Sequence, residues 1–204
     1  MAKNLAITVT PGPLKVVGAE TLHFCGEPVA IEADAYLCRC GGSASAPFCD
    51  GSHKTNGFKS DSAAREPMPL KIWQGKTLRT HFNPNACMHV FYCQPLAALR
   101  RREEAGDAAA ASEIAKVVQS CPSGALTYEP KEEGWAPDGD AASDAERPDI
   151  EIMEGGEIRI QRAFELNREL HEKQPRDRAT LCRCGSSKNK PFCDGRHKAK
   201  KGFR

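Results

Sequence analysis

The stretch "CRCGGSASAPFCDGSH", from Cys38 to His53, places three thiols and one imidazole within sixteen positions. Small and polar residues fill most of the other positions, so the stretch has little apolar surface to bury. In an extended backbone, residues i and i+2 point to the same side, so Cys38 and Cys40 can reach one metal centre. Cys49 and His53 are four residues apart, and we expect them on one face of a helical turn. The stretch therefore predicts a pocket of three cysteines and one histidine.

The same pattern occurs again near the carboxyl end, as "CRCGSSKNKPFCDGRH" from Cys182 to His197. Internal duplication of this kind indicates two similar structural units. Ahead of each copy, apolar residues alternate on both sides of a turn, which predicts β-hairpins over residues 5–16 and 150–160. The expected ligand sets are Cys38, Cys40, Cys49 and His53 in the first copy, and Cys182, Cys184, Cys193 and His197 in the second.

The composition indicates small units that need a bound group for stability. Aromatic residues make up 6% of the 204 residues, which include 17 Gly, 14 Pro and 10 Cys. The amino-terminal segment lacks the apolar run of a signal peptide, and no stretch reaches the ~20 apolar residues of a membrane span. We therefore expect a cytoplasmic protein whose clustered thiols bind metal rather than each other. The formal net charge of +2 argues neither for nor against nucleic acid. We expect neither a nucleic-acid nor a membrane partner.

Two kinds of metal centre suit these ligands. Thiolates and imidazole bind either a structural zinc ion or an iron-sulfur cluster, and ligand softness does not separate the two. Zinc sites usually use a CxxC pair. Here a CxC pair is followed by eight residues and CxxxH, which spreads the ligands more widely, as a two-iron core requires.

The first copy resembles the signature of the CDGSH iron-sulfur (NEET) family, with CxC, Ser43, Pro47 and the run Cys49-Asp50-Gly51-Ser52-His53. The resemblance implies a [2Fe-2S] cluster in each copy, with one iron bound by two thiolates and the other by a thiolate and the histidine. It also implies a β-cage shared by two motifs. Because both motifs lie in one chain, as in tandem bacterial-type members, we expect a monomeric pseudo-dimer, with a homodimer as the alternative.

The second copy departs from the family pattern at one position. It has Ser187, Pro191 and Cys193-Asp194-Gly195, but Arg196 stands where the family has a small residue. A guanidinium beside His197 would disfavour the imidazolium and place positive charge near the cluster, raising its reduction potential. The alternative is that Arg196 points to solvent.

Residues 63–130 differ from both copies and contain "CMHVFYC" (Cys87–Cys93) and "CPSGAL" (Cys121–Leu126). A downstream Cys-Pro pair is the closing ligand pattern of bacterial-type ferredoxins, although their CxxCxxC run is missing. The stretch is similar to the divergent single-cluster ferredoxin family, whose members carry CxHxxxC followed by CPSGAL. This resemblance implies a ferredoxin-like domain with one cubane-type cluster held by Cys87, Cys93 and Cys121.

The number of iron atoms in this third cluster depends on a fourth ligand. Three cysteines complete a [3Fe-4S] cluster, which we favour. A [4Fe-4S] cluster needs His89 or the unpaired Cys25 in addition. The alternative to both is a cluster-free fold in which Cys87 and Cys93 only pack.

These motifs predict an α+β protein of four segments. They are an N-terminal CDGSH unit at 1–62, a ferredoxin-like domain at 63–130, an acidic flexible linker at 131–148 and a C-terminal CDGSH unit at 149–204. In the central domain we expect a hairpin over residues 70–78. We also expect an amphipathic helix from Ile114 to Cys121 that faces inward and is ended by Pro122.

The sequence predicts a carrier rather than an enzyme, because no segment offers a nucleophile with its base, a phosphate loop or paired acid-base carboxylates. We expect electron transfer or cluster transfer, with redox or cluster-acceptor proteins as partners. The alternatives are a structural zinc-binding interaction protein and an electron-relay subunit of a larger oxidoreductase. Since imidazole is neutral where thiolate is negative and is protonated near neutral pH, each outer cluster should be easier to reduce and labile to acid.

Overall fold

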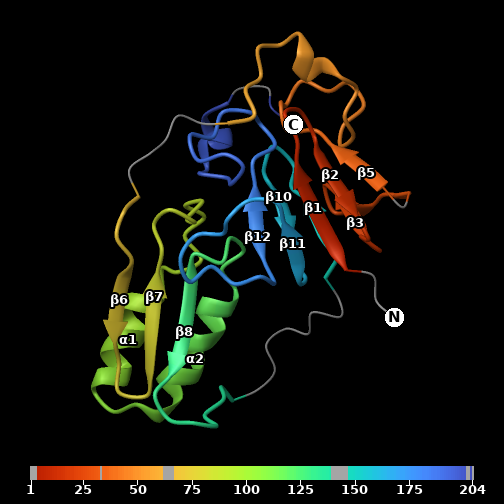
Figure 1. Cartoon of the computed structure of the whole chain (residues 1–204). Coiled ribbons are helices and arrows are strands. Elements are labelled where there is room, and N and C mark those ends of the chain that lie inside the picture. Colours follow the sequence, from red (N-terminus) through yellow and green to blue (C-terminus); the bar gives the residue numbers. More distant parts are fainter. Residues whose placement is uncertain (1–3, 33, 62–66, 139–146, 201–202, 204) are drawn as a thin grey trace.

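The computed structural model describes residues 4–32, 34–61, 67–138, 147–200 and 203. The predicted linker at 131–148 falls partly outside these described residues, because 139–146 are not among them. The two copies of the cysteine motif, with the strands that precede them, are called the N-terminal repeat and the C-terminal repeat. Together they form a β-rich part, and the segment between them forms a separate α+β part (Figure 1).

Both sheets of the β-rich part contain strands from both repeats. The four-stranded sheet has the order β11-β1-β2-β5, with β11 (Phe164–Leu166), β1 (Leu5–Val9), β2 (Leu14–Val17) and β5 (Asp34–Leu37). The five-stranded sheet has the order β12-β10-β9-β3-β4, with β12 (Ala179–Leu181), β10 (Ile158–Ile160), β9 (Ile150–Ile152), β3 (Leu22–Phe24) and β4 (Glu27–Pro28). Two parallel pairings, β1 with β11 and β3 with β9, join the repeats.

The predicted hairpins are confirmed as β1–β2 and β9–β10. Alternation along these strands turns one set of side chains inward, and the inward sets of both repeats meet in a single core. Its largest fully buried members include Leu5, Ile7, Leu14, Leu37, Ile150, Ile152 and Ile158. The two repeats therefore share one hydrophobic core within the chain, as a pseudo-dimer requires.

A core substitution should destabilise both repeats together. Ile152 is fully buried on β9, which lies between β10 of its own repeat and β3 of the other. We expect Ile152→Ala to cost about 2–5 kcal/mol of unfolding free energy. Urea unfolding followed by circular dichroism should show the β-rich part melting in one shifted transition. Ile72→Ala, at a side chain that is 53% exposed, is the control and should change little. Separate transitions for the repeats would contradict a shared core.

The central part is a three-stranded antiparallel sheet covered by two helices. The strands follow the order β6 (Lys71–Gln74), β7 (Leu78–Phe82) and β8 (Leu126–Pro130), and the helices are α1 (Leu96–Glu104) and α2 (Ala108–Gln119). The predicted hairpin and amphipathic helix are confirmed. The helix ends two residues before Cys121, however, so this cysteine follows the helix instead of lying in its last turn. Helix α1 was not predicted, because its stretch is dominated by charged residues and buries only Leu96, Leu99 and Glu103.

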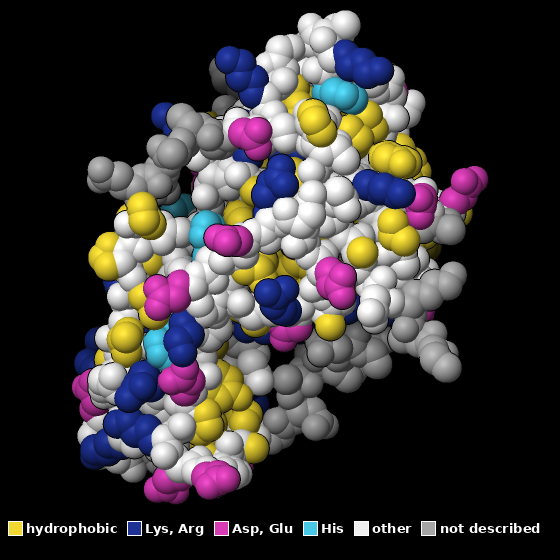
Figure 2. Space-filling view, in the orientation of Figure 1, with side chains coloured by type: hydrophobic (Ala, Val, Ile, Leu, Met, Phe, Trp, Pro, Cys, Tyr) yellow, Lys and Arg dark blue, Asp and Glu magenta, His cyan; other side chains and the backbone are white. Residues whose placement is uncertain are grey.

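The cysteine-containing loop of the C-terminal repeat lies between the loop of the N-terminal repeat and the central part (Figure 1). In Figure 1 this blue loop is flanked by the orange loop of the N-terminal repeat and by the yellow and green central part. On the face shown in Figure 2, basic and acidic side chains are interspersed. Among the described residues, no helix combines the length and apolar character needed to cross a membrane.

Candidate iron-sulfur sites

The N-terminal ligand set comes together just after β5. The Sγ atoms of Cys38 and Cys40 are 3.6 Å apart, and both side chains are buried. The Sγ atom of Cys49 lies 3.3 Å from Nδ1 of His53, and these two residues are half-buried. The backbone N–H of Cys49 donates to the backbone oxygen of Tyr36, two residues before Cys38, so the two pairs lie side by side. The CxC pair is the buried one, and the Cys-His pair is the more exposed.

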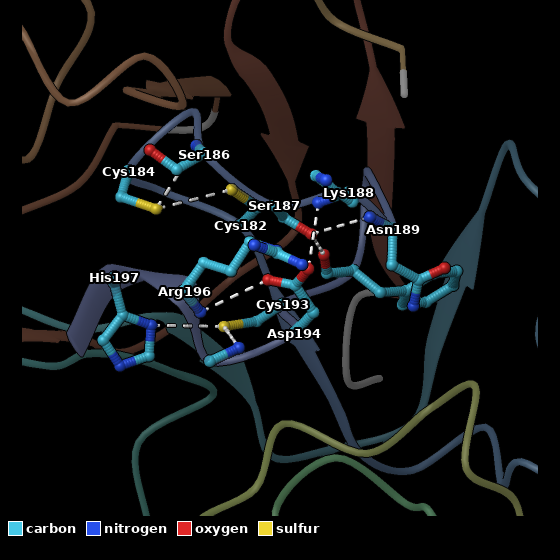
Figure 3. A network of polar contacts seen from close by, with 12 residues as sticks. Cys182, Cys184, Ser186, Ser187, Lys188, Asn189, Cys193, Asp194, Arg196 and His197 are labelled. Atoms are coloured by element: carbon cyan, nitrogen blue, oxygen red, sulfur yellow. Dashed lines mark hydrogen bonds and ion pairs between the residues drawn. The ribbon is translucent and has the colours of Figure 1, made fainter. Parts of the chain in front are cut away.

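The C-terminal ligand set has the same arrangement and is more deeply buried (Figure 3). The Sγ atoms of Cys182 and Cys184 are 3.9 Å apart, and Sγ of Cys193 lies 3.4 Å from Nδ1 of His197. All four side chains are buried, and His197 is 8% exposed. The two sets thus differ in access to solvent although their sequences are closely similar.

One local prediction is wrong. Cys49 and His53 do not share a helix face, because the helical turn is a short 3₁₀ helix (Ser52–Lys54) that begins after Cys49. The residue between them, Gly51, has φ of +89°, in the left-handed region that glycine adopts without a steric cost. The chain reverses at this glycine and so returns the imidazole to the thiol. Gly195, with φ of +80°, does the same before the 3₁₀ helix Arg196–Ala199.

In each ligand loop, an aspartate carboxylate accepts hydrogen bonds from backbone N–H groups of the loop. Asp50 accepts hydrogen bonds from the backbone N–H groups of Ala44 at 2.7 Å and Ser52 at 2.9 Å. Together with the Ser52 hydroxyl, which contributes most, these bonds hold the pKa of the Asp50 carboxyl well below its usual range. Asp194 accepts the equivalent backbone bonds in the C-terminal repeat. These hydrogen bonds hold the loop that carries the third cysteine and the histidine of each set.

Arg196 is engaged with this aspartate. Its Nε donates to Oδ2 of Asp194 at 3.0 Å, and its side chain is 51% exposed. In Figure 3 its guanidinium lies beside Asp194, and the ring of His197 lies on the other side of Cys193. Arg196 therefore takes the place of the Ser52 hydroxyl of the first copy as a partner of the loop aspartate.

The chemistry of the donors fits a cationic metal core. Cysteines of both sets are free thiols although they lie close together. Burial raises the pKa of the Cys193 thiol to about 12, so this group would stay protonated at neutral pH without a nearby cation. A bound metal takes the thiolate form, because its charge stabilises the deprotonated ligand. Each set thus provides the donors of a Cys₃His cluster.

The two outer ligand loops contact each other through their CxC segments. Cys40 and Cys184 form an isolated antiparallel bridge. A Cβ atom at Gly41 would lie 3.2 Å from Cα of Cys184, and one at Gly185 would lie 3.1 Å from the backbone oxygen of Cys40. Glycine at both positions therefore lets the two ligand loops approach closely. A hollow of about 450 Å³ opens beside this junction and is lined by Lys59, Lys190 and Lys200 among other residues.

The third candidate site lies in the central part. Cys87, Cys93 and Cys121 line one small apolar cavity together with His89, as the sequence predicts. Nδ1 of His89 is 3.7 Å from Sγ of Cys87, and burial raises the pKa of the Cys87 thiol. Cys25 does not line this cavity. It lies in the turn between β3 and β4 of the β-rich part.

The loop that carries this third set packs directly on the C-terminal set. A Cβ atom at Gly195 would lie 2.5 Å from the backbone oxygen of Met88, so the two segments are in direct contact there. Nζ of Lys198 donates to the backbone oxygen of His89 and lies over the ring of Phe91. Each contact joins residues that lie within two positions of a predicted ligand of their own set.

A further residue beside the C-terminal set, Glu157, is not predicted by any sequence motif. This residue lies in the hairpin turn between β9 and β10, and its side chain is 3% exposed. Its Oε2 is 3.6 Å from Nε2 of His197, and one ligand atom of each of Glu157, Cys193 and His197 lies within 4.8 Å of the others. No local signal marks the residue, because the contact spans forty positions of sequence.

Comparison with protein families agrees with this geometry. A model described as the iron-binding zinc finger of CDGSH type matches residues 11–54 and again residues 151–198. The chain carries two CDGSH-type units. A second model, described as a divergent 4Fe-4S mono-cluster, matches residues 73–131 of the central part. The two CDGSH units and the mono-cluster domain make this an iron-sulfur protein. Comparison with curated proteins and with solved structures gives no match.

Proposed function

We propose that this tandem CDGSH protein is a non-enzymatic electron carrier whose central cluster exchanges electrons with the two outer clusters. The outer clusters would be [2Fe-2S] clusters held by Cys38, Cys40, Cys49 and His53, and by Cys182, Cys184, Cys193 and His197. Its partners would be redox proteins. Neither a nucleic acid nor a membrane is needed for this role.

The observation that carries the proposal is the unbroken series of contacts between the three ligand sets. The loop of Cys87 and Cys93 touches the C-terminal unit at Gly195, and Cys184 of that unit pairs with Cys40 of the N-terminal unit. A protein that only delivered clusters would have no need for three adjoining sites. Adjacency of the sites therefore favours electron transfer over cluster transfer and over a structural zinc role.

We further propose a [4Fe-4S] cluster in the central domain, with His89 as its fourth ligand. His89 lines the same cavity as the three cysteines, whereas Cys25 lies in the β-rich part. The description of the matching family model also supports four iron atoms. This proposal replaces our preference for three iron atoms, which rested on the count of cysteines alone.

Electron paramagnetic resonance of the anaerobically purified protein, with iron, zinc and acid-labile sulfide measured on the same sample, tests the proposed function. We expect two reduced [2Fe-2S] signals with histidine-type g values, a distinct signal from the central cluster, and negligible zinc. These signals should also be broadened by magnetic interaction between neighbouring reduced clusters. A colourless protein that contains zinc in place of iron and sulfide would overturn the proposal.

A further inference from the structure

The two CDGSH units differ behind the histidine ligand. In the strand registers, Leu14 lies opposite Leu37, and Ile158 lies opposite Leu181. Because Leu37 and Leu181 each immediately precede a CxC pair, Leu14 and Ile158 are equivalent. The residues just before them, Pro13 and Glu157, are then equivalent as well. The turn behind the imidazole thus carries a carboxylate in one unit and a proline in the other.

In the C-terminal unit the carboxylate is buried and held in place. Oε1 of Glu157 accepts a hydrogen bond from Nε of Arg159 at 2.8 Å, while Oε2 faces Nε2 of His197 at 3.6 Å. Nδ1 of the same ring faces the Cys193 thiol. One ring nitrogen is therefore directed to the metal side and the other to the carboxylate. A metal-bound histidine is commonly oriented through its second nitrogen in this way.

In the N-terminal unit the ring lies against the turn itself. A Cβ atom at Gly12 would clash with the imidazole of His53, which therefore packs on bare backbone. The side chain of His53 is half-buried, and among the described residues no ion pair joins it to a carboxylate. The two imidazoles thus differ both in exposure and in the group behind them.

We propose that Glu157 is a positioning residue for His197, which makes the C-terminal cluster the more tightly held and the harder to reduce of the two outer clusters. The carboxylate fixes the ring through Nε2 and increases electron donation from Nδ1 to the metal. Greater donation and the added negative charge both favour the oxidised cluster, so the reduction potential falls. The inference rests on the proposed function, because it concerns the same clusters.

This difference gives the relay a direction. The C-terminal cluster adjoins the central domain, and the N-terminal cluster, whose ligands Cys49 and His53 are only half-buried, is the more accessible of the two. An electron that enters from the central cluster would move on to the N-terminal cluster, where the higher potential holds it near the surface. The N-terminal unit is then the side that meets the redox partner.

The test uses Glu157→Gln in the full-length protein, in a His53→Cys background. In that background His197 is the remaining imidazole ligand of an outer cluster, so its nitrogen couplings in pulsed paramagnetic resonance come without those of His53. Gln keeps the shape of the side chain and removes its charge. Glu151→Gln is the matched control, since Glu151 faces Arg159 at 3.7 Å and does not contact His197. All measurements are made at one fixed pH.

We expect three changes in Glu157→Gln and none of them in Glu151→Gln. The nitrogen couplings shift, the midpoint potential of the C-terminal cluster rises, and iron loss to a chelator becomes about tenfold faster, because removing such a supporting partner weakens metal binding. Glu157→Asp, which keeps the charge but shortens the side chain, should give intermediate values. A general loss of folding would instead alter the circular dichroism melting curve of the whole β-rich part.

Unchanged couplings and potential in a folded Glu157→Gln protein would overturn the inference, and so would equal effects of Glu151→Gln. Failure of the proposed function looks different. In that case the parent protein itself would show no [2Fe-2S] signal, or its clusters would not exchange electrons with the central domain.

Discussion

Gly195→Ala is expected to disrupt the contact between the central domain and the C-terminal CDGSH unit. Gly195 has φ of +80°, and an added Cβ would lie 2.5 Å from the backbone oxygen of Met88. The left-handed backbone costs an alanine roughly 1–2 kcal/mol, and overpacking against a backbone atom adds about 1–3 kcal/mol. The two loops must move apart to relieve this clash. Electron exchange between the central and outer clusters should then slow, because it depends on their separation.

The chain supplies its own control for this substitution. Gly51 occupies the equivalent position of the N-terminal unit, with φ of +89°, and a Cβ atom there would meet nothing within 4 Å. Gly51→Ala should therefore show the backbone cost alone and leave electron exchange unchanged. Freeze-quenched paramagnetic resonance after rapid partial reduction measures the exchange, and urea unfolding measures the stability. Equal behaviour of the two variants would contradict the importance of the Gly195–Met88 contact.

His89→Ala is expected to convert the central cluster from [4Fe-4S] to [3Fe-4S]. With His89 removed, one iron atom of such a cluster would have no protein ligand and would be readily lost. The oxidised variant should show the [3Fe-4S] signal, and its iron content should fall by about one atom per chain. Cys121→Ala should instead abolish the central cluster while both outer signals remain.

Cys25→Ala is the control for this experiment. Cys25 is exposed and lies outside the cavity of the central site, so its removal should leave all three clusters intact. If Cys25→Ala produced the [3Fe-4S] signal and His89→Ala did not, Cys25 would be the fourth ligand. A [3Fe-4S] signal already present in the parent protein prepared without oxygen would support three iron atoms.

Much of the site could be predicted from local spacing. The CxC pair and the CDGSH run place the ligands of each outer set within sixteen positions, and such short segments adopt only a few conformations. The third set spans more of the chain, and only its resemblance to a known family linked Cys121 to Cys87 and Cys93. The structure brings these predicted ligands together. The alternation of apolar residues predicted the hairpins, and their helical spacing predicted α2. Both patterns are local, because they show which side of a single strand or helix is buried. The error at Cys49 and His53 arose where the left-handed Gly51 interrupts that periodicity.

The sequence by itself determined the duplication and the α+β class and predicted the ligand sets, because each can be read from motifs and periodicities within short segments of the chain. The tertiary structure alone decided that β1 pairs with β11 and β3 with β9, so that the repeats share one core. It also decided that Met88 meets Gly195 and that Glu157 faces His197. These contacts join segments tens to more than a hundred residues apart. They depend on how whole elements pack, which no pattern within a single element encodes.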